Sequence, residues 1–232
     1  MTASIKCLEL RNLSKPPTPL RSVNFRHTTP GSGVVLVTKH KSQSTSDLFD
    51  PTYPGAHLSL DKRRSLAPRW VSPHLSLFAF PKAFLTKPDV PFSKPYKLRP
   101  YPAPTTPAQR EQRRAVDMSM QVLAFKSRVV LRPVVRTKIK RRLKEAIRLI
   151  VTRGAAVEES CRGPRIVFRA EDVGAEKWIM ADWTYMVLPT TELFRMPFAE
   201  QVGLMRKALG AIHHCIPKVE RILRRSVKSE AR

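Results

Sequence analysis

The sequence predicts an α/β protein in which helices pack on a sheet (an α+β sandwich), preceded by a long, proline-rich, largely disordered basic arm. Three observations lead to this prediction. Sixteen of the 21 prolines fall in residues 1–107, and proline interrupts both long helices and central strands. From residue 108 onward, apolar runs of strand length alternate with two long stretches of helical periodicity. The chain also carries 43 Lys and Arg against 18 Asp and Glu, a formal net charge of +25.

The first 107 residues divide into two segments of different composition. Residues 1–45 hold one acid, Glu9, among seven Lys and Arg, with frequent Ser and Thr and no apolar core of the secretory kind. This composition is typical of a mitochondrial or plastid transit peptide, and we expect a mitochondrial location; the alternative is a disordered basic tail. Residues 46–107 are expected to be an extended arm, because their proline content excludes long helices.

This half of the chain is itself basic, with 16 Lys and Arg against 5 Asp and Glu. We therefore expect it to contact RNA, to act as a targeting leader, or both. Two short apolar pieces within it, Gly33–Thr38 and His74–Phe80, are candidates for additional strands. The sequence leaves open whether these pieces join the sheet of the domain that follows.

An RNA-binding α/β domain is predicted over residues 108–228, within the usual size range of a domain. A long helix, Val134–Val151, is expected to end near Gly154. No internal repeat is present, and the alternation of strands with helices predicts helices packed on a sheet. The predicted strands are Met120–Phe125, Arg128–Val135 (interrupted by Pro133), Gly163–Ala170 and Asp182–Pro189.

A second long helix is predicted after Pro197, because proline suits the first turn of a helix. Pro217 is expected to kink or end this helix, since it has no backbone N–H to donate. Apolar residues recur at i, i+4, i+7, i+11 and i+14, which is the spacing of one core-facing stripe: Phe198, Val202, Met205, Leu209 and Ile212.

The helix Val134–Val151 is predicted to have two different faces. The outer face is almost entirely cationic, with eight basic residues from Arg132 to Arg148 and one acid, Glu145. Like charges four residues apart cost ~0.2–0.5 kcal/mol per pair, whereas bound phosphates would neutralise them and release condensed counterions. At 100° per residue, the apolar side chains fall on the opposite arc and face the core: Ile139, Leu143, Ala146, Ile147 and Ile150.

The cationic face predicts binding to nucleic acid. Solvated helix faces without a partner normally mix charges of both signs, and this face does not. Arginine suits phosphate oxygens and stacks on unpaired bases, and no helix-turn-helix, zinc-finger or basic-zipper pattern points to duplex DNA. A membrane is not expected as a partner, because no apolar run approaches the ~20 residues of a spanning helix. The predicted RNA-binding residues are Arg132, Arg136, Lys138, Lys140, Arg141, Arg142, Lys144 and Arg148.

No motif for catalysis by the protein itself is present. P-loop, GxGxxG, GxSxG and HExxH patterns are absent, so no catalytic residue and no small-molecule substrate are predicted. The carboxylates of the folded half have no spacing that would assemble a two-metal nuclease site. His213-His214-Cys215 is interpreted as a histidine pair at a helix end near a core cysteine, because adjacent side chains on a helix diverge by ~100° and cannot close a metal site alone.

Three aromatic residues lie near or along the last predicted strand: Trp178, Trp183 and Tyr185. Each ring has faces on which unpaired bases of RNA can stack. The alternative is that they belong to the core or its edge, and we expect the core for Tyr185 or Trp183, whichever faces inward.

The stretch RTKIKRRLKEAIR, Arg136–Arg148, resembles the "RNR" helix of the bacterial-type ribonuclease P protein subunit. The family's pattern runs approximately A-V-x-R-N-R-[IV]-K-R-R-[LI]-[RK]-E-[AS]-x-R; Pro133-Val134-Val135 stands for A-V-x, and Thr137 and Lys138 stand for the N and the second R. Upstream, VLAFKSR is similar to the strand that precedes this helix in the family. Downstream, ADWTYMVLPTTELFRMPFAEQVGLMRKAL is similar to its last strand, loop and final helix.

The resemblance covers Met120 to Ile212 and implies a fold like domain 2 of ribosomal protein S5, with a parallel βαβ unit of left-handed crossover. It also implies that the RNR-like helix docks on a catalytic RNA, while a cleft in the sheet holds the 5′ leader of precursor tRNA. Hydrolysis would be carried by Mg²⁺ bound to the RNA, with no cofactor bound by the protein alone. The family's first helix and first two strands have a candidate counterpart only in His74–Phe80 and its neighbours.

Two functions follow from these observations. The first is the protein component of a ribonuclease P-type endoribonuclease that removes tRNA 5′ leaders, and the RNR-like helix favours it. The alternative is a structural RNA-binding protein of the mitochondrial ribosome, and the long basic proline-rich arm favours it. RNA is the partner in both, either a catalytic RNA with precursor tRNA or ribosomal RNA.

Overall fold

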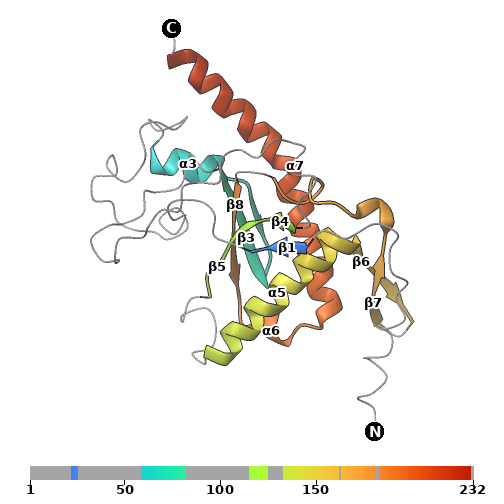
Figure 1. The fold of residues 1–232 in the computed structure, drawn as a ribbon. Helices are drawn as coiled ribbons and strands as arrows, with labels where there is room; N and C mark the ends of the chain where they lie inside the picture. The colour runs from blue at the N-terminus through green and yellow to red at the C-terminus, as the bar shows by residue number, and fades with distance from the viewer. Residues whose placement is uncertain are drawn as a thin grey trace.

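The centre of the fold is a mixed four-stranded sheet with the strand order β2-β3-β8-β5 (Figure 1). The computed structural model describes residues 22–25, 59–81, 115–124, 133–161, 163–180 and 183–230. Strand β3, Leu75–Pro81, pairs antiparallel with both β2, Arg69–Val71, and β8, Trp183–Pro189. Strand β5, Ser119–Val122, pairs parallel with β8 on its other side. The predicted mixed α/β class is confirmed.

Strand β8 is the most enclosed part of this sheet. All seven of its residues are buried, as the near-continuous apolar run WTYMVLP indicates for a strand covered on both faces. Its register places Val187 opposite Leu77 of β3 and Tyr185 opposite Ala79. The hydroxyl of Thr184, which is also buried, lies 3.1 Å from that of Ser119 in β5. This contact joins two buried hydroxyl groups across neighbouring strands, in keeping with the rule that buried polar groups are hydrogen-bonded.

Two long helices, α5 (Pro133–Arg153) and α7 (Phe198–Glu230), pack against each other, and α7 also lies along β2 and β3. Both helices confirm the predictions made from the apolar periodicity of the sequence. The predicted core face of α5 is buried, with exposures of 0–2%, and the α7 stripe is buried except for Phe198, which is half-buried. One apolar core joins these helices to the sheet, and its burial is the main driving force for the fold.

Two prolines act differently from the prediction. Pro133 begins α5 instead of interrupting a strand, so the predicted strand Arg128–Val135 is wrong for Pro133–Val135; its residues 128–132 lie outside the described part. The fixed φ of proline suits the first turn of a helix, where its missing N–H leaves no bond unmade. Pro217 lies inside α7, which continues to Glu230, so the helix does not end there. The C-terminal part of α7 projects from the body of the molecule (Figure 1).

Part of the expected arm is folded. Helix α3, Leu60–Leu66, precedes the β2–β3 hairpin, and the hydroxyl of Ser59 caps it by accepting a 3.3 Å hydrogen bond from the backbone N–H of Lys62. The candidate strand His74–Phe80 is confirmed as β3. The prediction of an extended arm is therefore wrong for residues 59–81, and the candidate strand at residues 33–38 lies outside the described residues.

A second sheet pairs two short strands in parallel: β1, Ser22–Asn24, and β4, Ala115–Asp117. Val23 of β1 is 1% exposed and belongs to the core. The backbone N–H of Met118 donates to the carbonyl oxygen of Asn24 at 2.9 Å. A strand of the folded domain thus comes from the segment expected to be a leader or tail.

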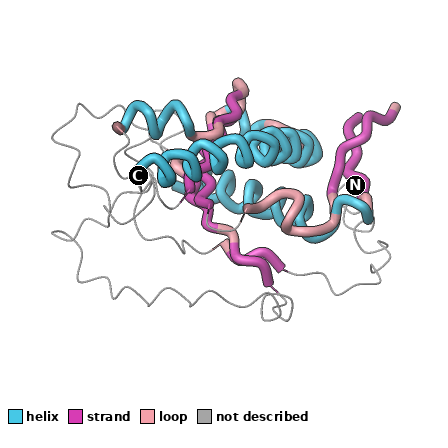
Figure 2. Tube along the Cα trace, turned by 90° about the horizontal axis from the view of Figure 1, so that it is seen from above, coloured by secondary structure: helices cyan, strands magenta, loops and turns pink. Residues whose placement is uncertain are grey.

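A β-hairpin joins α5 to the rest of the chain. It consists of β6, Ala155–Ser160, and β7, Gly163–Phe168, and it projects to one side of the body (Figure 2). In this hairpin only β7 corresponds to a predicted strand, because the apolar run of β6 is three residues long and is followed by Glu158, Glu159 and Ser160. Gly154 has φ 63°, a left-handed conformation that favours glycine, and it turns the chain from α5 into β6.

Two short helical segments complete the described chain. The 3₁₀ helix η3, Ala170–Asp172, follows the hairpin, and α6, Glu192–Arg195, lies between β8 and α7. Neither was expected from the sequence, since a single turn is too short to show helical periodicity. Among the described helices, none combines the length and the apolar character needed to cross a bilayer.

Candidate nucleic-acid interface

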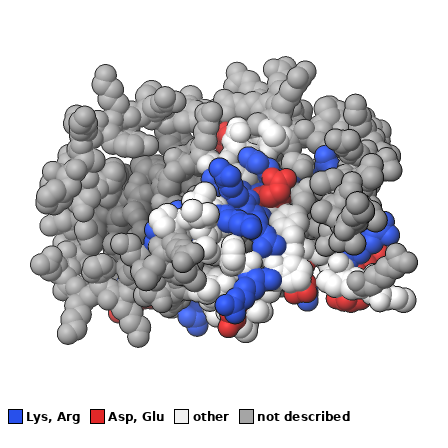
Figure 3. All heavy atoms as spheres, turned by 90° about the horizontal axis from the view of Figure 1, so that it is seen from below, with Lys and Arg blue, Asp and Glu red and all other residues white. Residues whose placement is uncertain are grey.

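The outer face of α5 carries the cations that were predicted to bind RNA. Burial of the apolar stripe fixes the rotation of the helix, so the cationic arc points away from the core. Figure 3 shows Lys and Arg side chains gathered in a band on one face of the described part. Lys138, Lys140, Arg141 and Arg148 are exposed, Arg136, Arg142 and Lys144 are half-buried, and Arg132 lies outside the described residues.

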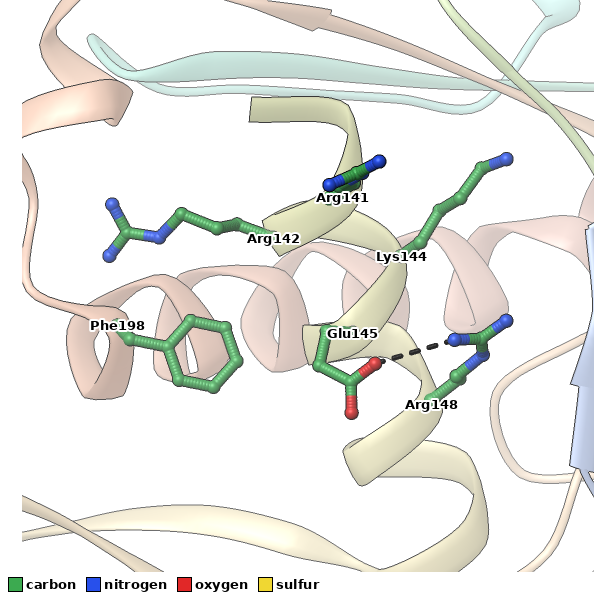
Figure 4. A pocket seen from close by; sticks show the side chains of 6 residues that line it. All are labelled: Arg141, Arg142, Lys144, Glu145, Arg148 and Phe198. Carbon is green, nitrogen blue, oxygen red and sulfur yellow. Dashed lines mark hydrogen bonds and ion pairs between the residues drawn. The ribbon is translucent and has the colours of Figure 1, made fainter. Parts of the chain in front are cut away.

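A shallow, open depression of about 550 Å³ lies between the outer face of α5 and the start of α7 (Figure 4). The one acid in it, Glu145, accepts a 3.4 Å hydrogen bond from Arg148, which leaves the hollow with a net positive charge. Pockets for small molecules are enclosed, whereas this hollow is open and lined by five charged side chains, which suits a charged polymer that lies across it. The residues that line it are Arg141, Arg142, Lys144, Glu145, Arg148 and Phe198.

Arg142 differs from its neighbours because its guanidinium is engaged within the protein. It donates hydrogen bonds to the carbonyl oxygens of Phe194 at 3.0 Å and Met196 at 2.9 Å. Burial lowers the pKa of Arg142 from its usual value. The residue therefore ties α5 to the turn between α6 and α7, whereas the sequence had placed it among the solvent-facing ligands of RNA.

Three phenylalanines flank the cationic face, and no pattern in the sequence predicts them. On the side of α6 and α7, Lys138 Nζ lies 5.3 Å from the ring centroid of Phe194, and Arg142 Cζ lies 5.8 Å from that of Phe198. On the opposite side of α5, one ring, that of Phe25, contacts two further cations of the helix. Distances within ~6 Å favour attraction between a cation and the face of an aromatic ring.

Other cations of α5 are free of such contacts among the described residues, and the two exposed ones, Lys140 and Arg141, are called the free ridge here. Lys140 and Arg141 are exposed and have no hydrogen-bond or ion-pair partner within the described part of the chain. The same holds for Arg136, which is half-buried. Such side chains can turn all their donors to phosphate oxygens without breaking a contact inside the protein.

The aromatic residues around the last strand belong to the core. Trp178 is 8% exposed, Trp183 4% and Tyr185 0%. The hydroxyl oxygen of Tyr185 accepts a 2.9 Å hydrogen bond from the backbone N–H of Met180, and burial raises the pKa of Tyr185 to about 12. The expectation of a core position is confirmed for Trp183 and Tyr185. Rings buried to this degree present no face to a base.

The His213-His214-Cys215 cluster differs from its predicted position. It lies in the middle of α7, so it is not at a helix end, and Cys215 is exposed, so the expected core cysteine is wrong. His214 is exposed as well, whereas His213 is half-buried. Within the described ranges, no three His, Cys, Asp or Glu side chains are grouped so that they could hold a metal ion.

The interface is thus a rigid helix with a free cationic ridge, a shallow hollow and aromatic flanks. Comparisons of the chain with family models, with curated proteins and with solved structures give no match. What the protein binds is therefore inferred from the charge, exposure and packing of α5.

Proposed function

We propose that the protein binds RNA through the outer face of α5, as the protein subunit of a ribonuclease P-type ribonucleoprotein that acts in tRNA 5′-leader processing. The observation that carries the proposal is the free cationic ridge on a helix whose other face is locked into the core. Lys140 and Arg141 are exposed there, while Leu143 is 0% exposed on the opposite side. A surface of this kind binds a polyanion without refolding.

The charge distribution on α5 supports a phosphate polymer as the ligand. Helix α5 carries seven of the predicted RNA-binding cations and one acid, Glu145, which is paired with Arg148. Repulsion among these cations destabilises the free helix, and it is relieved when phosphates lie against them. Binding by this mechanism weakens steeply as the salt concentration rises, because each neutralised phosphate releases counterions.

The resemblance of Arg136–Arg148 to the RNR helix points to the ribonuclease P class, and the order of elements supports it. In the described chain, α3, β2 and β3 precede β5, α5, β8 and α7. These elements correspond in type and order to the first helix, the three strands, the RNR helix, the last strand and the final helix that the resemblance implies. Strands β5 and β8 are parallel neighbours with α5 between them in the chain, an arrangement that supports a βαβ unit of the ribosomal protein S5 domain 2-like kind.

In this role the protein supplies binding and orientation, and the chemistry belongs to the RNA. Side chains of α5 would hold phosphates of the catalytic RNA, and Mg²⁺ bound by that RNA would carry the hydrolysis of precursor tRNA. No protein group is assigned to a chemical step. The effect of the protein would appear as tighter binding of the RNA partner and substrate.

A structural RNA-binding protein of the mitochondrial ribosome is the second candidate. One specific observation favours it: outside the folded residues 22–25 and 59–81, residues 1–107 hold 13 prolines and 12 Lys and Arg, a composition suited to an extended arm that follows RNA. The cationic face of α5 would serve this role equally well.

Crosslinking in cells followed by sequencing of the bound RNA, with sucrose-gradient sedimentation of the same lysate, distinguishes the two. We expect precursor tRNA with its 5′ leader and one structured non-ribosomal RNA. Ribosomal RNA in a fraction that sediments with a ribosomal subunit would establish the alternative. Equal recovery of RNA by wild type and by a variant with Lys140→Glu, Arg141→Glu and Lys144→Glu would contradict binding through α5.

A further inference from the structure

We propose that Phe25 is a positioning residue of the RNA-binding face, which holds the side chains of Lys144 and Arg148 against its ring so that both are ordered before phosphate arrives. This inference rests on the proposed binding of RNA by α5. It gives residues 22–25 a function in the folded domain, although their composition had suggested a leader or tail.

The contact joins one ring to two cations of the same helix face. Lys144 Nζ lies 5.5 Å from the ring centroid of Phe25, and Arg148 Cζ lies 5.4 Å from it. Residues four apart lie above one another on a helix, so a single ring reaches both side chains. Lys144 is half-buried and the side chain of Arg148 is 49% exposed, so both cations remain accessible to a ligand.

The ring is held in place by strand β1, which ends at the preceding residue. Val23, two residues before it, is 1% exposed in the core, and the carbonyl oxygen of Asn24 accepts a 2.9 Å hydrogen bond from the backbone N–H of Met118. The side-chain amide of Asn24 also donates to Asp117 at 3.3 Å. Strand β1 contacts α5 directly. Phe25 therefore meets the helix from a fixed position and itself packs against the core.

Ordering these two cations favours the binding of phosphate for a physical reason. Long Lys and Arg side chains lose rotamer freedom when they are fixed on a ligand, and a side chain already held in place loses less. The negative face of the ring also offsets the repulsion between two cations that lie one helical turn apart. Lysine and arginine each carry several N–H donors, so donors remain for phosphate oxygens beside the ring contact and the hydrogen bond from Arg148 to Glu145.

Two substitutions of Phe25 in the full-length protein distinguish the effect of the aromatic ring from that of an apolar side chain at the same position. Phe25→Leu keeps an apolar side chain but removes the ring, and Phe25→Tyr keeps the ring. With a labelled precursor tRNA transcript at low salt, we expect Phe25→Leu to weaken binding about two- to fivefold. We expect Phe25→Tyr to bind as wild type does, and both variants to unfold thermally near the wild-type temperature. A loss of affinity with Phe25→Tyr equal to that with Phe25→Leu would show that the ring is not what matters.

A double-mutant cycle tests whether Phe25 acts through the two cations. In a background of Lys144→Ala with Arg148→Ala, Phe25→Leu should cause no further loss of affinity. An equal loss in both backgrounds would overturn the inference, and so would unchanged binding by Phe25→Leu alone. Tighter binding by Phe25→Leu would also overturn it, because the ring would then shield the cations from RNA.

The same titrations distinguish a failure of this inference from a failure of the proposed function. Lys140→Ala with Arg141→Ala removes the free ridge and leaves Phe25 and its two cations untouched. If that variant binds the transcript as wild type does, RNA binding by α5 is wrong, and this inference is wrong with it. If that variant is weakened while Phe25→Leu is not, the proposed function stands and only the positioning role of Phe25 is lost.

Discussion

Arg142 donates a hydrogen bond of 2.9 Å to the carbonyl oxygen of Met196 and thereby joins α5 to the turn that precedes α7. Arg141, adjacent in the chain, is exposed and has no such partner among the described residues. Two neighbouring arginines of one basic run therefore have different functions, one architectural and one available to a ligand. Because both residues are arginine, replacing each by alanine removes the same chemical groups. A difference in stability between the two variants therefore reports the difference in their contacts.

Arg142→Ala should destabilise the protein, and Arg141→Ala should not. Removing Arg142 leaves the carbonyl oxygens of Phe194 and Met196 without this donor, and we expect the free energy of unfolding to fall by about 1–3 kcal/mol. Arg141→Ala should change it by less than about 0.5 kcal/mol, as is usual for exposed positions. Urea denaturation of both variants checks this. Equal stability of the two would contradict the architectural role of Arg142.

Loss of two cations from the outer face of α5 should change the salt dependence of RNA binding. For Arg141→Ala with Lys144→Ala, we expect weaker binding and a log–log salt slope shallower by about one to two, because one or two phosphate contacts are lost. The matched control is Lys62→Ala with Lys207→Ala, which removes two exposed cations from α3 and α7. An equal change of slope in the control would show that net charge, and not the face of α5, determines binding.

Gly154→Ala should destabilise the protein more than Gly163→Ala. Both glycines have positive φ, 63° and 103°, so both substitutions introduce backbone strain. At Gly154 an added Cβ would also lie 2.0 Å from the carbonyl oxygen of Arg169, whereas at Gly163 nothing lies within 4 Å. For Gly154→Ala we expect the free energy of unfolding to fall by more than about 2 kcal/mol, because backbone strain of ~1–2 kcal/mol adds to the clash. Thermal unfolding of the pair is the measurement, and equal losses would contradict this account.

The stability contributed by Asp172 should depend on pH. Its carboxylate accepts a hydrogen bond from Arg206, and this bond, together with the nearby charges of Arg206, Lys177 and Arg169, lowers the pKa of Asp172 despite partial burial. A pKa that is lower in the folded state than in the unfolded state, where it is ~3.9, stabilises the protein above about pH 4, and this stabilisation is lost as the pH falls.

We therefore expect Asp172→Asn to be less stable than wild type at pH 7 and the difference to narrow below about pH 4. Denaturant unfolding of both proteins across a series of pH values measures it. A difference that stayed constant down to pH 3 would show that the charge of Asp172 is not what stabilises the contact with Arg206.

The local elements were largely predictable. The limits of α5 follow from an apolar stripe of period 3.6 and from Gly154 at its end, and the rotation that buries Leu143 is the one that exposes Lys140 and Arg141. These are properties of a single helix, which its own residues determine. The function of Arg142 was not predictable, because its acceptors, Phe194 and Met196, belong to a turn about fifty positions later in the chain.

The prolines also show which features the sequence predicts and which depend on distant segments. Residues 59–81 were expected to be extended because prolines surround them, yet the β2–β3 hairpin, with Pro81 at its end, forms part of the central sheet. Proline is compatible with strand ends, and Leu75 and Leu77 are buried completely once β8 lies beside them. The decisive partner of β3 lies more than one hundred positions away.

By itself, the sequence determined the charge of the protein, the two long helices, the strands β7 and β8, and the cationic face of α5. Only the tertiary structure decided that α3, β2 and β3 belong to the domain, that Arg142 is a tie between elements, and that Phe25 meets Lys144 and Arg148. The reason is the range of the forces. Periodicity and turn chemistry act over a few residues and can be recognised in the chain, whereas strand pairing and side-chain contacts depend on which distant segments bury their apolar surface together.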